Sequence, residues 1–353
     1  MASSLDKSHS VLSYRKFFYW SITMETTLNS TTESATLNDN INLSANDFDK
    51  QLLNFVKDFC TPYERMRESL GHVRVAATVE KATKGKDLPL WPVDTNYVSM
   101  DGILSLYNLM YGQANRAQGQ APVNEDDQLM EMIFYPSILS GCFAWDKVRN
   151  IVHVNNKQLD SSLLDCSCAS LAKLPQWAIC FNTVEQNLLW NERPVAGVIF
   201  YRYFLSKQPS AITGAPFNAN NGLDGEPDAT INNLSTIVIY HNGEMDIGPY
   251  IELNAPGSVN SYLDNMTNRL QASSDVIEMS ADHSNEELQK MAMDATQRSR
   301  EIFTLLAYLF KNLDQLKNAK GDKVSFAPNP EPVKTKNGYR LFGGDSSRSY
   351  YLD

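Results

Sequence analysis

The sequence predicts an α+β fold, in which a central, largely antiparallel β-sheet is flanked by helices, with a long C-terminal helix and a basic Pro-rich tail. Three observations lead to this expectation. Apolar residues recur at helical spacing before residue 145 and again after residue 284. Short runs rich in Val, Ile, Tyr and Phe lie between these two regions and are typical of strands. An Asn242-Gly243 pair separates two of these runs and predicts a hairpin, because a type I′ turn requires positive φ at both central residues.

The composition is that of an ordinary globular protein. The chain has 353 residues, of which 42% are hydrophobic and 20% charged, and its formal net charge is -10. No stretch approaches the roughly 18 uninterrupted apolar residues of a membrane-spanning helix. The apolar cluster from Phe17 to Trp20 follows Arg15 and Lys16 and is too short for the core of a signal peptide. Five cysteines, an odd number, suit reduced thiols, so we expect a cytoplasmic protein.

We expect one ordered domain between two ends of different composition. Residues 1–45 are rich in Ser, Thr and Asn and bury too little apolar area to offset chain entropy, which predicts a disordered extension with Met24 as an alternative start. The α+β domain is expected over 46–320, and a basic Pro/Gly-rich tail over 321–353. The expected parts of the domain follow one another along the chain: helical 46–145, sheet 148–255 and helix 284–318.

Two helices are predicted most directly. The first begins near Asn46, where large apolar residues recur every three or four positions: Phe48, Leu52, Phe55, Val56 and Phe59. The second begins at Ser284, which forms a capping box with Glu287, and its apolar positions continue to Leu316. Gly321 lies just beyond the expected end of this helix.

Charge is unevenly distributed along the chain. Residues 317–340 contain six Lys or Arg against two Asp or Glu, a net charge of +4, which leaves -14 for the remainder. A molecule with this balance repels phosphate backbones except through its basic segment. Lys334, Lys336 and Arg340 are therefore candidate contacts to RNA or the ribosome, with a solvated charge run as the alternative.

Metal binding is not expected. Cys166 and Cys168 could supply half of a zinc site, but a structural site needs four ligands, and the five histidines are scattered. His241, Glu244 and Asp246 lie around the expected hairpin turn and could form a metal site or an acid–base pair. A polar turn that faces water is the simpler interpretation. We expect no metal and no small-molecule cofactor.

The sequence contains no nucleophile elbow, P-loop or dinucleotide fingerprint. His153, on a short predicted strand, is expected to be a packed side chain rather than a base. A nuclease centre assembled from dispersed carboxylates stays an alternative, because a single sequence does not reveal one. We therefore name no catalytic residue and favour a non-enzymatic function.

Aromatic residues supply the candidate binding positions. Tyr201 and Tyr203 alternate with Arg202, so one face of that strand could be exposed and grip a peptide or stack bases, or could pack inside a sandwich. Trp177 lies among apolar neighbours, which favours a core position. We name Trp177, Tyr201 and Tyr203 as candidate peptide- or partner-binding residues.

Five segments, taken in order, resemble one family, the AcrVA-two-like anti-CRISPR group carried by mobile elements of bacteria, plasmids and phages among them. They are 138–151 (ILSGCFAWDKVRNI), 174–183 (LPQWAICFNT), 196–204 (AGVIFYRYF), 247–264 (IGPYIELNAPGSVNSYLD) and 330–342 (PEPVKTKNGYRLF). The first resembles the family's helix ending in an Ala-Trp pair, the second its Leu-Pro-x-Trp motif, and the last its Gly-aromatic-Arg-x-Phe signature. The resemblance is patchy and covers roughly residues 48–342.

The chain also departs from the family pattern. Gln176 stands where the family has an acidic residue, and Ala178 where the family tends to have cysteine. The chain stops at Asp353, about where the family pattern continues into a further short segment.

The resemblance implies inhibition of type V-A CRISPR immunity through suppressed production of the nuclease. A nascent N-terminal peptide would be recognised during translation, and its mRNA would be lost. The implied partner is a nascent polypeptide or a ribosome-bound translation complex, with RNA contact through the basic tail and no membrane. Two alternatives stay open: a stoichiometric protein inhibitor that binds a defence nuclease, and a metal-dependent ribonuclease that uses carboxylates such as Asp246 or Glu244.

Overall fold

The computed structural model describes the chain in several ranges, which hold its main elements. They are 43–60, 137–139, 141–155, 159–173, 178–206, 227–272, 285–328, 333–335, 338–340 and 346–353. Most of the extension expected over 1–45, including Met24, lies outside the described residues, as do residues 61–136, Trp177 and Lys336.

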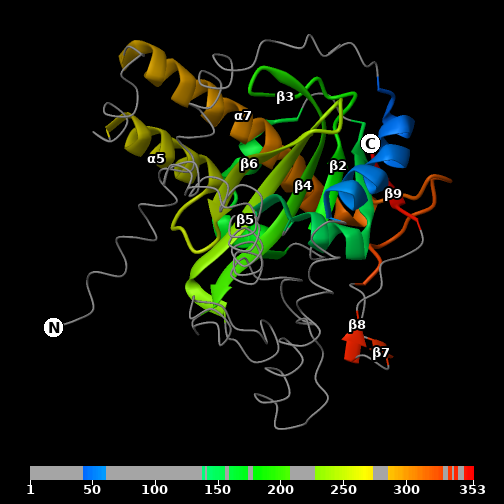
Figure 1. Ribbon diagram of the computed structural model, residues 1–353. Helices are drawn as coiled ribbons and strands as arrows, with labels where there is room; N and C mark the ends of the chain where they lie inside the picture. Colours follow the sequence, from blue (N-terminus) through cyan, green and yellow to red (C-terminus); the bar gives the residue numbers. More distant parts are fainter. Residues whose placement is uncertain are drawn as a thin grey trace, which may run out of the picture.

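A seven-stranded sheet forms the centre of the molecule (Figure 1). Its strand order is β6-β5-β4-β2-β1-β9, and β3 pairs with β4 beside this path. The neighbours from β6 to β2 are antiparallel, whereas β1 is parallel to both β2 and β9. The predicted α+β class is confirmed. The strands are β1 Asn150–Val154, β2 Ala178–Asn182, β3 Leu189–Trp190, β4 Arg193–Ser206, β5 Pro227–Tyr240, β6 Met245–Glu252 and β9 Arg348–Leu352.

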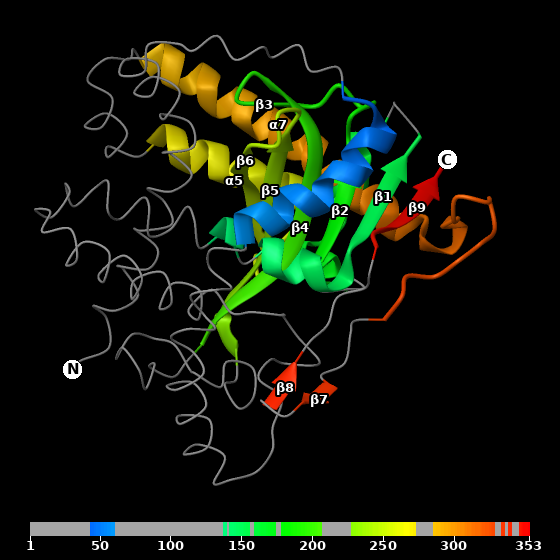
Figure 2. The ribbon, with the colours of Figure 1, turned by 45° about the vertical axis from the view of Figure 1, so that its right-hand side comes forward.

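Helices cover both faces of this sheet (Figure 2). On one face lie a helix over 45–60 and a short helix over 141–148. On the other face lie α5 and α7, together with short 3-10 turns. These elements are α5 Val259–Ala272, α7 Asn285–Lys311, η1 Ser161–Asp165, η2 Cys168–Lys173 and η3 Leu313–Gln315. Within the part of the chain that the structure describes, no helix is both long and apolar enough to cross a bilayer.

Alternate residues of the central strands face two separate cores. Ile151 of β1 and Cys180 of β2 belong to the cluster beneath the helix over 45–60, whereas Val152 and Phe181 belong to the cluster beneath α7. Because both faces of β1, β2 and the middle of β4 are covered, these strands are buried at every position rather than at every second one, and most of their residues are apolar.

The helix over 45–60 lies close to the sheet because the strand beneath it carries small residues. Phe48 and Leu52 are fully buried, and Phe48 lies directly over Gly197 of β4. A Cβ atom at Gly197 would be 2.3 Å from Phe48 Cζ. Ser44 caps the helix by accepting a hydrogen bond from the Asp47 N–H at 3.2 Å.

The expected hairpin at Asn242-Gly243 joins β5 to β6, but its turn is not type I′. Gly243 has φ +85°, and Asn242 is not among the residues with positive φ. The Gly243 N–H donates to Tyr240 O, and the Tyr240 N–H donates to Glu244 O, both at 2.9 Å. This pattern is a type I turn closed by a glycine bulge, which requires positive φ once rather than twice.

The C-terminal strand differs from the expected organisation. Residues 321–353 were expected to form a tail, yet β9 lies in the central sheet, paired with β1 from Asn150↔Arg348 to Val154↔Leu352. Its other edge contacts Lys317, which exchanges two backbone hydrogen bonds with Tyr351. The remaining strands of this region, β7 Val333–Thr335 and β8 Gly338–Arg340, form a separate two-stranded sheet.

Gly197→Ala should lower the free energy of unfolding by about 2 kcal/mol, because the new methyl group has no room beneath Phe48. Urea denaturation followed by circular dichroism measures this change. The matched variant is Gly197→Ala with Phe48→Leu, in which the smaller side chain relieves the clash. The double variant should lose less stability than the sum of the two single changes. Strict additivity would show that the close packing over Gly197 is not a constraint.

Candidate functional site

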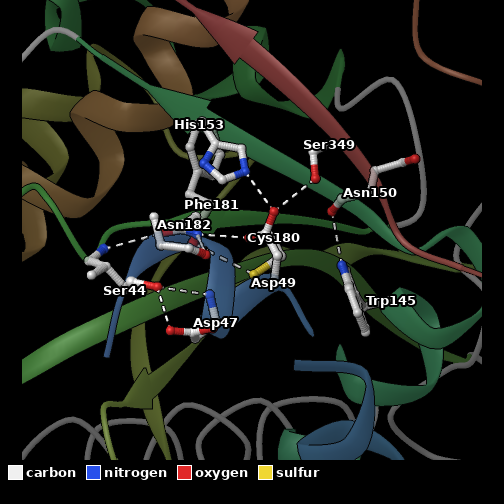
Figure 3. A network of polar contacts seen from close by, with 12 residues as sticks. Ser44, Asp47, Asp49, Trp145, Asn150, His153, Cys180, Phe181, Asn182 and Ser349 are labelled. Carbon is white, nitrogen blue, oxygen red and sulfur yellow. Dashed lines mark hydrogen bonds and ion pairs between the residues drawn. The ribbon is translucent and has the colours of Figure 1, made fainter. Parts of the chain in front are cut away.

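The carboxylate of Asp49, on the helix over 45–60, has hydrogen-bond partners on three strands of the central sheet (Figure 3). Its Oδ2 atom lies 2.9 Å from His153 Nε2 and accepts a hydrogen bond from Ser349 Oγ at 2.8 Å. Its Oδ1 atom accepts a hydrogen bond from Asn182 Nδ2 at 2.8 Å. We call Asp49, His153, Asn182 and Ser349 the Asp49 cluster.

The sheet brings the other three members of the Asp49 cluster onto one face. His153 lies on β1, Asn182 at the end of β2 and Ser349 on β9, and these strands are neighbours. Asn182 and His153 are 6% and 8% exposed, so the carboxylate meets its donors largely out of water. The His153 ring stacks on Tyr351 of β9, with ring centroids 4.6 Å apart and an interplanar angle of 13°.

The Asp49 cluster contains the residue types of a serine hydrolase in a different order. In a catalytic triad the imidazole lies between the hydroxyl and the carboxylate, so that it can remove the proton of the nucleophile. Here the carboxylate lies between them, and Ser349 Oγ donates to Asp49 rather than to His153. The arrangement holds a helix on a sheet and does not activate Ser349. This agrees with the interpretation of His153 as a packed side chain.

Two groups under the influence of Asp49, the Cys180 thiol and the Tyr351 hydroxyl, have raised pKa values. Burial, followed by the negative charge of Asp49, raises the pKa of the Cys180 thiol well above its ordinary value. The same two causes raise the pKa of Tyr351. Because a thiolate is the reactive form of cysteine, Cys180 is a buried apolar group here rather than a nucleophile.

A second polar group lies where the β3–β4 and β5–β6 hairpins meet, and it contains the predicted Glu244 and Asp246. Asp246 Oδ2 accepts hydrogen bonds from Tyr240 Oη and Asn191 Nδ2, both at 3.0 Å. Glu244 forms an ion pair with Arg193, whose guanidinium lies 3.8 Å from the centroid of the Tyr240 ring. Both carboxylates therefore join the two hairpins.

Burial raises the pKa of Asp246, although its hydrogen bonds and Arg193 oppose this. Burial also tends to raise the pKa of Glu244. The hydrogen bonds with Arg193 and Asn242 outweigh this effect, so the pKa of Glu244 is lowered. His241 is only half-buried on the turn. Across the described ranges, no group of three His, Cys, Asp or Glu residues could hold a metal ion.

The structure places Tyr201 differently from the expected exposed face. Tyr201 is 2% exposed, and its hydroxyl donates to Ser137 O at 2.8 Å. It belongs to the core beneath the helices over 45–60 and 141–148, because β4 is an inner strand covered on both faces. The packing alternative therefore holds for Tyr201, which offers no surface to a peptide.

The other predicted site residues are placed only in part. Tyr203 lies in β4, Lys334 in β7 and Arg340 in β8. The register pairs Lys334 with Tyr339 and Val333 with Arg340, so the two basic residues are not cross-strand partners. Trp177 and Lys336 lie outside the described residues.

Both edges of the central sheet are partly closed to strand addition. On β6 the Ile247 N–H donates to Asp246 Oδ1 at 2.7 Å, and Pro249 has no N–H to offer. On β9 both backbone groups of Tyr351 are bonded to Lys317. Free donors and acceptors along an edge are what a peptide strand needs, and these positions do not provide them.

Sequence reasoning did not find Asp49 or Ser349. Asp49 lies within an amphipathic helix, where a single carboxylate beside the apolar stripe is indistinguishable from a solvated one. Ser349 lies in the segment that was expected to be a tail. The pairing of β9 with β1 brings Ser349 close to Asp49, and no local sequence pattern predicts this pairing.

Comparison with solved structures finds a distant structural likeness. No family model matches the chain, and no curated protein matches it. The crystal structure of AcrVA2 is similar to this chain with probability 1.00, a TM-score of 0.47 and 13% sequence identity, over 87% of this chain and 82% of that chain. At this identity no residue role is transferred from AcrVA2.

Asp49→Ala should lower the free energy of unfolding by about 2–4 kcal/mol, because Asn182, His153 and Ser349 would each lose an acceptor in a shielded site. Ser349→Ala should cost about 1 kcal/mol, since it removes one donor and leaves the others paired. Asp58→Ala, an exposed change on the same helix, is the control and should stay within about 0.5 kcal/mol of the wild type. Equal losses for Asp49→Ala and Asp58→Ala in urea denaturation would contradict the role of the Asp49 cluster.

Asp246→Asn should become more stable relative to the wild type as the pH rises from about 4 to about 7. The folded-state pKa of Asp246 is raised, so the folded protein holds the proton more tightly than the unfolded chain. Wild-type stability is therefore lost as the pH rises through that raised pKa, and the Asn variant has no such loss. Urea midpoints measured across this pH range test the difference.

Glu244→Gln provides the control of opposite sign. The folded-state pKa of Glu244 is lowered, so its contribution is present above the unfolded pKa of about 4.3 and is lost as the pH falls through the folded value. Relative to the wild type, Glu244→Gln should thus lose stability as the pH rises. Parallel trends for the two variants would contradict both assignments.

Proposed function

We propose that this protein is anti-CRISPR-like and suppresses the production of a target nuclease by recognising the nascent N-terminal peptide, with loss of the mRNA. The observation that carries the proposal is the ordered resemblance of five segments to the AcrVA-two-like group. Four of these segments supply neighbouring parts of one fold. They are the helix over 141–148 with β1, then β2, the middle of β4, and β6 with the start of α5.

The positions of these segments support a shared architecture rather than scattered similarity. Strands β1, β2 and β4 are adjacent in the sheet, and the helix over 141–148 packs on the same core. Trp145, of the Ala-Trp pair, is fully buried, and its Nε1 donates to Asn150 O at 2.9 Å. A residue that sets the junction between a helix and the next strand is constrained by the fold, which explains why such a motif persists between distant sequences.

The polar chemistry of the described residues suits binding better than catalysis. The carboxylates named for the ribonuclease alternative, Asp246 and Glu244, already accept hydrogen bonds from Tyr240, Asn191 and Arg193. A metal-dependent nuclease needs carboxylate oxygens directed at the metal and the phosphate. In this proposal the partner is a nascent polypeptide or a ribosome-bound translation complex in the cytoplasm, as the resemblance implies. In this proposal Lys334, Lys336 and Arg340 contact RNA.

The test is transcript abundance of a type V-A nuclease gene in bacteria with and without this protein. Three versions of the gene are compared: the native 5′ coding region, a synonymous recoding, and a frameshifted version that keeps the nucleotides but changes the peptide. Loss of message is expected for the first two, which encode the same peptide, and rescue for the third, which keeps the nucleotides of the first but encodes a different peptide. A gene for this protein with an early stop codon controls for expression load.

Two outcomes would contradict the proposal. Survival of the synonymously recoded message would show that nucleotides, not the peptide, are recognised. Unchanged message in all versions, with the folded nuclease co-purifying with this protein, would identify a stoichiometric inhibitor instead.

A further inference from the structure

The edge of the sheet formed by β9 carries a group of exposed cations. Lys320, Lys323 and Arg348 are exposed, and among the described residues none of them forms an ion pair. We call these three residues the β9-edge cations. They come from two segments that are distant in the sequence and that meet because Lys317 pairs with Tyr351 of β9.

The loop that carries two of these lysines is held in one conformation. Lys317 and Lys323 form an antiparallel bridge across its base. At its tip, Asn318 Oδ1 accepts hydrogen bonds from the N–H groups of Lys320 and Asp322, at 2.9 and 3.0 Å. The loop lies outside β9 at the margin of the molecule (Figures 1 and 2). Little backbone entropy is therefore lost when a partner binds there.

The carboxylates closest to the loop already have partners. Asp353 accepts hydrogen bonds from Lys317 Nζ and Asn155 Nδ2, and these contacts lower its pKa. Asp322 Oδ2 accepts a hydrogen bond from Asn318 Nδ2 at 3.1 Å. Asp314, on η3, is a further exposed acid among the described residues of this region. The side chains of Lys317, Lys320, Lys323 and Arg348 against those of Asp314, Asp322 and Asp353 leave a local charge of +1, in a molecule whose formal net charge is -10.

We infer that the β9-edge cations contact the phosphate backbone of RNA. This inference rests on the proposed function, in which the protein acts on a translation complex. Lysine is a point charge that neutralises a phosphate without a demanding geometry, and strongly negative surroundings confine RNA to the positive edge. A membrane surface fits less well, because Leu313, 37% exposed, is the large apolar side chain exposed near the loop, and one leucine does not anchor a protein to lipid.

The experiment measures binding of the full chain to a fluorescein-labelled single-stranded RNA of about 20 nucleotides, over a range of KCl concentrations. Lys320→Gln with Lys323→Gln should weaken binding about tenfold or more at about 50 mM salt. It should also reduce the slope of log affinity against log salt by about 1.4, since roughly 0.7 is lost for each phosphate contact on a single strand. Adding Arg348→Gln should reduce both quantities further.

The matched control is Lys50→Gln with Lys290→Gln, which removes the same charge from exposed positions on the helix over 45–60 and on α7. It should leave the salt slope unchanged. Equal effects of the two pairs would show a dependence on net charge alone and would overturn the inference. Binding to phosphatidylserine vesicles or to polyglutamate that depends on Lys320 and Lys323, without binding to RNA, would also overturn it.

The result separates this inference from the proposed function. Both lysines are exposed, so thermal unfolding of the variant should match the wild type and exclude a folding defect. If the protein does not bind RNA but still causes peptide-dependent loss of the message in cells, only the inferred RNA contact is contradicted. If the protein binds RNA through these lysines but causes no loss of message, the proposed function is contradicted instead.

Discussion

The attachment of the helix over 45–60 to the sheet depends on the half-buried carboxylate of Asp49. Apolar contacts such as Phe48 over Gly197 hold this helix on the sheet, but the hydrophobic effect behind them is not directional. A carboxylate out of water needs all of its donors at hydrogen-bond distance, and those donors come from β1, β2 and β9. One side chain therefore fixes the helix along its axis. It also ties the beginning of the described chain to its end, because Asp49 and Ser349 are 300 residues apart.

Local patterns predicted the elements that depend on local forces. The amphipathic stripe around Phe48 and the hairpin at Asn242-Gly243 both occur where expected, since spacing and turn chemistry act over a few residues. The turn type was wrong, because a single positive φ at Gly243 suffices when a bulge follows a type I turn. Two consecutive positive φ values occur instead at Asn191 and Glu192, between β3 and β4. Glutamate is not typical of such turns, so the β3–β4 hairpin could not be predicted from the sequence.

Features that depend on distant pairing could not be predicted. β9 joins β1 as a parallel neighbour, and a parallel pair has no connecting turn to mark it in the sequence. The contact between Ser349 and Asp49 depends on the position of β9 in the sheet. The Asp49 cluster therefore could not be predicted from the sequence. Tyr201 illustrates the same limit. Alternation along a strand indicates two faces but does not say whether a second layer covers both, and here it does.

These constraints bear on how such a fold can recognise a partner. Some positions on each sheet edge offer no backbone group to a partner: on β6 the Ile247 N–H is bonded to Asp246 and Pro249 has no N–H, and on β9 Tyr351 is bonded to Lys317. Capture of a peptide as an added strand would have to break those contacts first. Recognition through side chains on the outer surfaces has no such cost, and it agrees with a charge distribution in which Asp353 and Asp322, near the β9 edge, have partners within the chain. The proposed recognition by charge would therefore leave the sheet intact, while the buried polar groups keep the outer surfaces in place.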